Sequence, residues 1–101
     1  MMDPLFEVKS KTLGTGIQGT LRAYPEEVEV RTVHSPRDVE VQSARYDDIS
    51  KVEIDRGMTF AELKIKTSGL LRGETLLVRG LGVEDAERAK AFIEERIAHE
   101  G

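Results

Sequence analysis

Apolar residues alternate with polar ones through most of this chain and change to a helical spacing only near its end. Val28 and Val30 fall on one side of an extended segment, and Glu27 and Glu29 fall on the other. This period of two is typical of a strand with one buried and one wet face. In residues 84–98 the apolar residues recur every three to four positions instead, as in an amphipathic helix. The order predicts a small antiparallel sheet that is capped by its own C-terminal helix.

Turn residues divide the alternating part into seven segments. Pro25 can set the first central residue of a tight turn, and Pro36 cannot donate to a central ladder. The expected strands are residues 5–11, 20–24, 27–33, 39–46, 49–55, 61–66 and 75–81, with the helix at 84–98. The side chains expected in the core are Val28, Val30, Val52, Ile54, Leu63, Ile65, Phe92 and Ile93.

Length and composition allow one globular domain with an aliphatic core. The chain has 101 residues, of which 39% are apolar and 5% aromatic, so valine, isoleucine and leucine must fill its interior. We expect a single domain over residues 5–98, with flexible termini at 1–4 and 99–101. The absence of cysteine excludes disulfides and thiolate sites. Without a leader pattern or a run of about 18 to 20 apolar residues, the sequence predicts a cytoplasmic protein with no transmembrane segment.

Positive charge is concentrated in residues 56–81, which carry five basic and two acidic side chains in a chain with a net charge of −4. A nucleic-acid-binding domain usually has a denser and larger cationic surface, so nucleic acid is not an expected partner. Two strand lysines and three loop residues form the candidate site for an anionic ligand or partner: Lys64, Lys66, Leu70, Leu71 and Arg72. The alternative is a solvated strand face whose loop leucines fold back on the core.

Three glycines have the spacing of a phosphate-binding loop. Gly14, Gly16 and Gly19 match G-x-G-x-x-G. The dinucleotide-binding form of that loop opens a helix, whereas the residues after Gly19 are strand-like and lead to Pro25. The kinase form requires catalytic motifs that this chain lacks. A hairpin connection is therefore the favoured interpretation.

The remaining polar residues give no catalytic or metal-binding pattern. Asp47 and Asp48 are adjacent, so on an extended chain they point in opposite directions and favour a turn over a convergent pair with Asp55. His34 falls in an expected loop and His99 at the terminus, and their spacing announces no metal site. The serines have neither a nucleophile elbow nor a local base. The sequence predicts no enzyme activity, no cofactor and no metal.

One segment resembles the bacterial pleckstrin-homology-like (PH-like) domains: Tyr46-Asp47-Asp48-Ile49-Ser50-Lys51-Val52-Glu53-Ile54. Gly19-Thr20-Leu21 at the start of a strand, Gly57 after a later strand and Gly69 in a late hairpin are also similar to that family. The similarity extends over residues 6–98. It implies a bent seven-stranded antiparallel sheet or partial barrel capped by one C-terminal helix, a mainly β fold of the α+β type.

The same resemblance implies binding of proteins, lipids or further copies of the chain rather than catalysis. Members that bind phosphoinositides use a basic cluster around the first hairpin, where this chain offers only Lys9, Lys11 and Arg22. These residues are too few and too scattered to carry that activity over.

We therefore expect a non-enzymatic interaction domain that self-associates or binds a scaffold protein, because the edge of such a sheet must be covered or paired. The alternative is a module peripheral to the membrane that binds anionic lipid headgroups through residues 64–72. A small enzyme is a third class. A lipid-binding module should gather Lys64, Lys66 and Arg72 on one exposed face, whereas an oligomer should expose an apolar strand edge.

Overall fold

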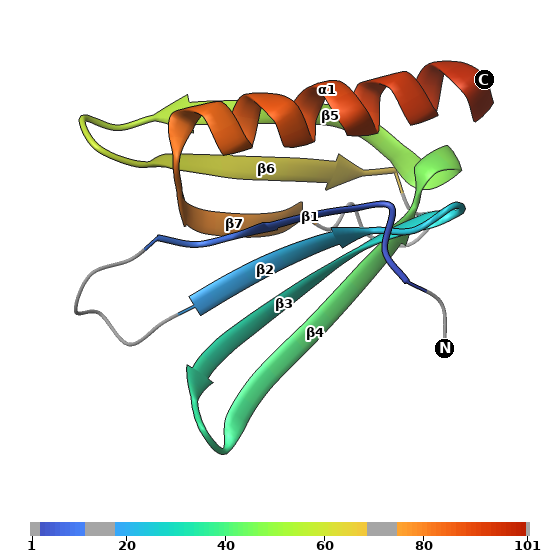
Figure 1. Cartoon of the computed structure of the whole chain (residues 1–101). Helices are drawn as coiled ribbons and strands as arrows, with labels where there is room; N and C mark the ends of the chain where they lie inside the picture. Colours follow the sequence, from blue (N-terminus) through green and yellow to red (C-terminus); the bar gives the residue numbers. More distant parts are fainter. Residues whose placement is uncertain (1–2, 12–17, 69–74, 101) are drawn as a thin grey trace.

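The structure is a computed structural model that describes residues 3–11, 18–68 and 75–100, with side chains through residue 98. Two antiparallel sheets and one helix account for the described residues (Figure 1). The first sheet has the strand order β1 (Phe6–Lys9), β2 (Gln18–Ala23), β3 (Glu27–Ser35) and β4 (Asp38–Arg45). After the 3-10 turn η1 (Tyr46–Asp48) the second sheet follows, with β5 (Ile49–Arg56), β6 (Ala61–Thr67) and β7 (Thr75–Leu81), and then α1 (Val83–Glu100).

This order of elements confirms the predicted mainly β fold with a C-terminal helix. The turn at Pro25 is present, with the Tyr24 N–H donating to the carbonyl of Glu27 at 2.8 Å. Asp47 and Asp48 lie in the predicted turn before β5. His34 was expected in a loop, and that prediction was wrong. The β3–β4 ladder continues to the Ser35–Asp38 pair, so His34 belongs to β3.

The core lies between the two sheets and under α1. Its largest fully buried side chains come from four strands, the 3-10 turn and the helix: Tyr46, Leu21, Leu63, Ile65, Leu76, Leu81, Ile93, Val28, Val30 and Val78. Of the predicted core residues, Ile54 and Phe92 are only partly buried, which corrects the expectation. β5 is an edge strand, so Ile54 keeps an open side, and Ile93 takes the inward position on the helix instead of Phe92.

The two sheets form separate ladders and do not close into a continuous barrel. Side-chain and backbone hydrogen bonds bridge them at one corner. Ser10 Oγ donates to the carbonyl of Arg79 at 2.5 Å and accepts from the Gly19 N–H at 3.0 Å, while the Lys11 N–H donates to Gly80 at 2.7 Å. Gly80 has φ of 74°, a conformation that glycine tolerates without strain, and lies at the register shift between β6 and β7.

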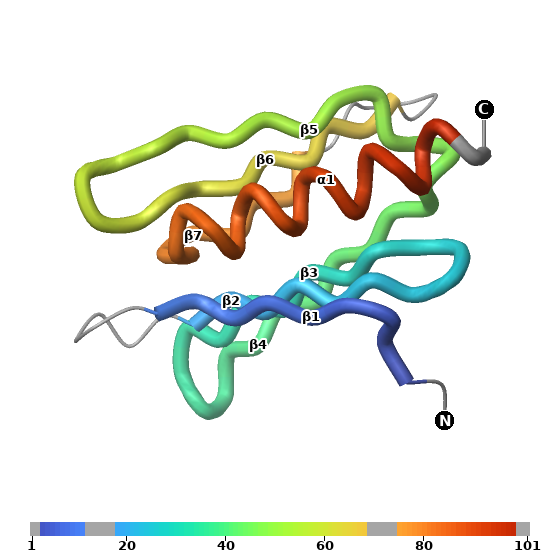
Figure 2. Tube along the Cα trace, turned by 45° about the horizontal axis from the view of Figure 1, so that its top comes forward, coloured from blue at the N-terminus to red at the C-terminus, as the bar shows by residue number. Residues whose placement is uncertain are grey.

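The helix covers the open side of this assembly, between the second sheet and β1 (Figure 2). Ala86, Ala89 and Ile93 form its fully buried stripe. Phe92 stacks on the Phe6 ring of β1, with the ring centroids 5.2 Å apart. These contacts make α1 a structural cap, as the order of elements predicted.

Candidate functional site

The predicted basic site lies partly on β6. Lys64 and Lys66 occupy its outward face, since Leu63 and Ile65 point into the core. Both lysines are close to carboxylates: Lys66 Nζ is 3.4 Å from Glu53 Oε2, and Lys64 Nζ is 3.9 Å from Glu62 Oε1. The structure therefore brings the two lysines to one face but surrounds them with acidic groups.

The three other candidate residues of that site, Leu70, Leu71 and Arg72, lie outside the described residues. The glycine motif at residues 14–19 is also outside them except for Gly19, which is buried within β2. A Cβ at Gly19 would lie 3.1 Å from Ser10 Oγ and 3.3 Å from a Val78 methyl carbon. Gly19 thus has a packing role where two sheets approach each other closely.

Glu53 connects the charges on the outer face of the second sheet. Its carboxylate lies 2.8 Å from Lys51 Nζ and accepts a contact from Lys66 as well. The hydrogen bond from Lys51, and after it the one from Lys66, lowers the pKa of Glu53. In turn, the hydrogen bond to Glu53 raises the pKa of Lys51. A shallow depression of about 430 Å³ along β5 is lined by Lys51, Val52, Glu53, Ile54, Asp55, Lys64 and Lys90. The outer face of the second sheet therefore carries a network of alternating positive and negative charges rather than a cationic patch.

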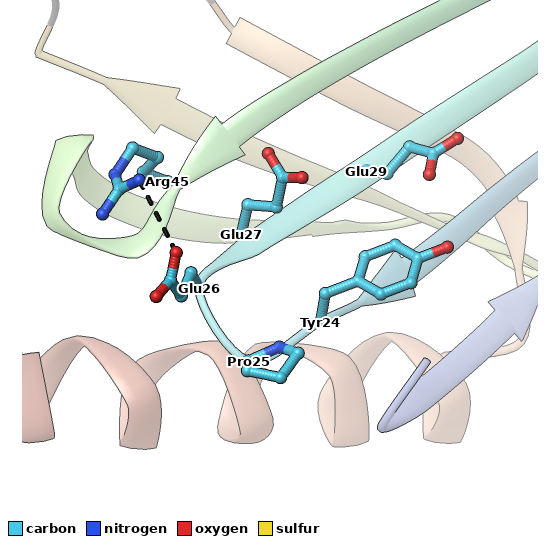
Figure 3. A pocket seen from close by; sticks show the side chains of 6 residues that line it. All are labelled: Tyr24, Pro25, Glu26, Glu27, Glu29 and Arg45. Atoms are coloured by element: carbon cyan, nitrogen blue, oxygen red, sulfur yellow. Dashed lines mark ion pairs between the residues drawn. The ribbon is translucent and has the colours of Figure 1, made fainter. Parts of the chain in front are cut away.

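A second depression, of about 550 Å³, lies at the turn between β2 and β3 (Figure 3). Its lining consists of Tyr24, Pro25, Glu26, Glu27, Glu29 and Arg45. Arg45 is held at the rim by two carboxylates, with Nη1 3.8 Å from Glu26 Oε2 and Nε 3.5 Å from Asp47 Oδ1. The lining supplies acidic groups and an aromatic ring without a nucleophile–base pair. In residues 3–11, 18–68 and 75–100, no group of three or more acidic or histidine side chains is arranged to hold a metal ion.

Most residues of β4, an edge strand of the first sheet, are exposed. Among the described strands β4 pairs with β3 alone, and α1 packs against β5, η1, β6 and β1. Figure 1 shows the β3–β4 hairpin projecting away from the helix. Ala44 is the one buried residue of β4, and residues 38–41 are all exposed. Within the described ranges, β4 thus has a free edge, and its residues 38–41 are exposed.

Two valines stand on this exposed strand. The side chains of Val39 and Val41 are 41% and 55% exposed, in contrast to the buried Val28 and Val30 of β3. They share one face because they are two residues apart, and Val39 lies opposite Val33 of β3. Val33, Val39 and Val41 therefore form an apolar patch on the outer face of the first sheet, which we call the valine patch.

The inner face of β4 holds its even-numbered residues. Ala44 pairs with the buried Val28, so Gln42 and Glu40 also point to the inner side, opposite Val30 and Thr32. The sequence pattern of residues 39–46 identified the strand but not which face the core would cover. Ala44 and Tyr46 have even numbers and the two valines have odd ones, so the two pairs point to opposite faces of the strand. The structure shows that the face of Ala44 and Tyr46 is the buried one.

Within the described part of the chain, no helix combines the length and the apolar character that crossing a membrane requires. The helix α1 has the length but carries charged side chains throughout. No family model, curated protein or solved structure matches the chain.

Proposed function

We propose that this chain is a non-enzymatic PH-like interaction domain that associates with protein, either a further copy or a scaffold, through the free edge of β4. Sheets of four and three antiparallel strands followed by a C-terminal helix support the PH-like assignment, because this is the arrangement that the resemblance implies. The observation that carries the functional proposal is the exposed valine patch on a strand that pairs on one side only.

A free strand edge of this kind has two sources of affinity. Its outward backbone N–H and C=O groups are a template for a further strand, and the ladder that forms satisfies them. Burial of Val39 and Val41 against the added chain would supply an apolar contribution, at about 25 cal/mol for each Å² of apolar surface removed from water. Neither source depends on charge, so the association should survive moderate salt.

The lipid-binding alternative depends on Lys64 and Lys66. They lie on one outward face, as that alternative requires, but each is within 4 Å of a carboxylate. An anionic bilayer contributes about 1 kcal/mol for each lysine near its surface, which must compete with these ion pairs. We therefore favour the protein edge over the lysine face.

Site-directed photo-crosslinking in the cells that produce the chain tests the proposal. A photoreactive residue replaces Val41 in one variant and Met58 in the control, because Met58 is fully exposed and lies in the turn after β5. The expected result is a protein adduct at position 41 that exceeds any adduct at position 58. Equal labelling at both positions, or none at position 41, would contradict the β4 edge as the binding surface.

A vesicle assay tests the alternative with purified protein. The chain should remain in solution when anionic phospholipid vesicles are sedimented at about 0.1 M salt, where the Debye length is about 10 Å. Binding to the vesicles that is lost in the double variant Lys64→Glu, Lys66→Glu would favour the lipid-binding module instead.

A further inference from the structure

The first half of β4, residues 38–41, has different chemistry on its two faces. Val39 and Val41 lie on the outer face of the first sheet. Asp38 and Glu40 alternate with them along the strand and therefore lie on the inner face. All four residues are exposed. A strand that is added beside this half would thus meet valines on one face and carboxylates on the other.

The two carboxylates of this half are not held by a lysine or an arginine. In the part of the chain that the structure describes, Asp38 forms no ion pair. Glu40 has His34 alone, with Oε2 3.7 Å from the imidazole Nε2, and this contact is an ion pair only when the histidine is protonated. Glu7 of β1, in contrast, is held by Arg22 at 2.6 Å. The acidic face of β4 is therefore open to a cation from outside the chain.

These two faces define the segment that fits beside the strand. Neighbouring side chains on adjacent strands stabilise a sheet when their charges are opposite and when β-branched residues meet. The added segment should therefore carry lysine or arginine on its inner face and valine or isoleucine on its outer face. Because the two faces alternate along a strand, basic and apolar residues must alternate in its sequence. This alternation is the same in both chain directions, so it selects composition and not polarity.

A second β4 strand does not have this composition. Its inner face carries Asp38, Glu40, Gln42 and Ala44, none of which is a cation. In a ladder between two copies, inner-face residues meet inner-face residues, so the carboxylates would face neutral or acidic side chains. Charge complementarity thus selects a partner with a different sequence.

From these two faces we infer that β4 pairs with an extended segment of another protein, in which basic residues alternate with β-branched apolar ones. The basic residues lie beside Asp38 and Glu40, and the apolar residues cover the valine patch. Figure 1 shows β4 as the outermost strand, on the side away from α1, so the helix does not obstruct the added segment. This inference rests on the proposed function and names the chemistry of its partner.

Fluorescence anisotropy of labelled synthetic peptides with the purified chain tests the alternation. One peptide alternates lysine with valine, a second alternates glutamate with valine, and a third has the composition of the first with its lysines and valines in separate blocks. At about 0.1 M salt the lysine–valine peptide should bind about tenfold more tightly than either of the others. Equal affinities of the first two peptides would overturn the charge complementarity. Equal affinities of the first and the third would overturn the pairing as a strand.

Charge reversal on the chain gives a sharper test of the acidic face. Asp38→Lys combined with Glu40→Lys should reverse the preference, so that the glutamate–valine peptide binds more tightly than the lysine–valine peptide. The matched control is Glu94→Lys combined with Glu95→Lys, which changes the net charge equally at two exposed positions of α1. The control should keep the wild-type preference. A preference that reverses in the control as well, or that stays unchanged in the β4 variant, would overturn this face as the site.

Salt separates the contributions of the two faces. Between 0.1 M and 1 M salt the Debye length falls from about 10 Å to about 3 Å, so the preference for lysine over glutamate should shrink. The backbone ladder and the valine contacts are not screened, so binding of the lysine–valine peptide should persist. Val41→Lys should weaken it at both salt concentrations, because the valine patch is lost. Complete loss of binding at 1 M salt, without an effect of Val41→Lys, would overturn the pairing as a strand.

The outcomes separate this inference from the proposed function. Position-41 crosslinks to a protein, without any preference for the lysine–valine peptide, would overturn the alternating basic segment while the β4 edge stands. Position-41 crosslinks to a second copy of the chain alone would overturn another protein as the partner, and the β4 edge would again stand. No position-41 crosslinks, together with no binding of the peptides, would overturn both.

Discussion

Apolar side chains are buried in the helix-capped half of the molecule but exposed on the outer face of the β3–β4 hairpin. Under α1, Ala86, Ala89 and Ile93 are fully buried against the second sheet and β1. On the hairpin, Val39 and Val41 have a similar apolar character but remain exposed. A side chain on an alternating strand is buried only where another layer covers its face, and no layer among the described residues covers the outer face that carries Val39 and Val41. We infer that the capped half determines stability and the hairpin determines association.

The largest effect should come from the centre of the helix cap. Ile93→Ala removes a fully buried side chain and should lower the free energy of unfolding by about 3 kcal/mol. Urea denaturation measures it, with the exposed Glu94→Ala as the control on the next helix position. A loss below about 1 kcal/mol would mean that α1 contributes little to the folded state.

A smaller loss is expected at the neighbouring aromatic residue. Phe92 is only partly buried, and its main contact is the stack on Phe6, so Phe92→Ala should cost about 2 kcal/mol. The guanidinium of Arg96 lies 5.7 Å from the Phe92 ring centroid and loses that contact too. The same denaturation series checks the order of the two variants, and a larger cost for Phe92 than for Ile93 would reverse our assignment of the inward position.

The turn that joins the two sheets should show a pH-dependent effect. The Tyr46 hydroxyl donates to the Tyr24 carbonyl at 2.7 Å, so Tyr46→Phe should cost about 1 kcal/mol at neutral pH. Burial raises the pKa of Tyr46 above 10.0, its ordinary value. Because the unfolded tyrosine ionises first, this contribution is present below pH 10 and is lost as the pH rises further. The difference between the two proteins should therefore narrow in alkaline urea titrations, and a gap that widens would contradict the burial of Tyr46.

The smallest effect on stability should accompany the largest effect on association. Val41→Lys replaces an exposed side chain and should change the free energy of unfolding by less than about 0.5 kcal/mol. Thermal unfolding of the dilute protein measures it under conditions where both chains are monomeric. A loss comparable to that of Ile93→Ala would place Val41 in the folding core and remove the distinction between the two regions.

The sequence was sufficient for the order of elements because strand and helix periods are local properties. The alternation around Val28 and the spacing around Ile93 each identify an element without knowledge of its neighbours. The choice between Phe92 and Ile93 as the inward residue depends on where β1 lies, since Phe92 meets Phe6 from a distant part of the chain. Local patterns carry no information about such a contact.

The prediction of candidate sites depended even more on tertiary structure than the prediction of the core did. Lys64 and Lys66 were predicted to share a face, and they do, but Glu53 reaches that face from a different strand. The exposure of Val39 and Val41 follows from the face of the first sheet that the core covers, and no single segment specifies that face. The other members of the predicted basic site, Leu70, Leu71 and Arg72, fall outside the described residues, so their role stays a prediction.

Hydrogen–deuterium exchange with and without the lysine–valine peptide tests the central claim most directly, because it reports on both regions in one experiment. Backbone amides of β4 should become more protected when the peptide is added, while those of the buried β6 remain unchanged. The Val41→Lys variant should show a weaker response to the peptide in β4. Protection that appears on β5 or α1 instead, or β4 exchange that does not respond to the peptide, would contradict pairing of such a segment with the β4 edge.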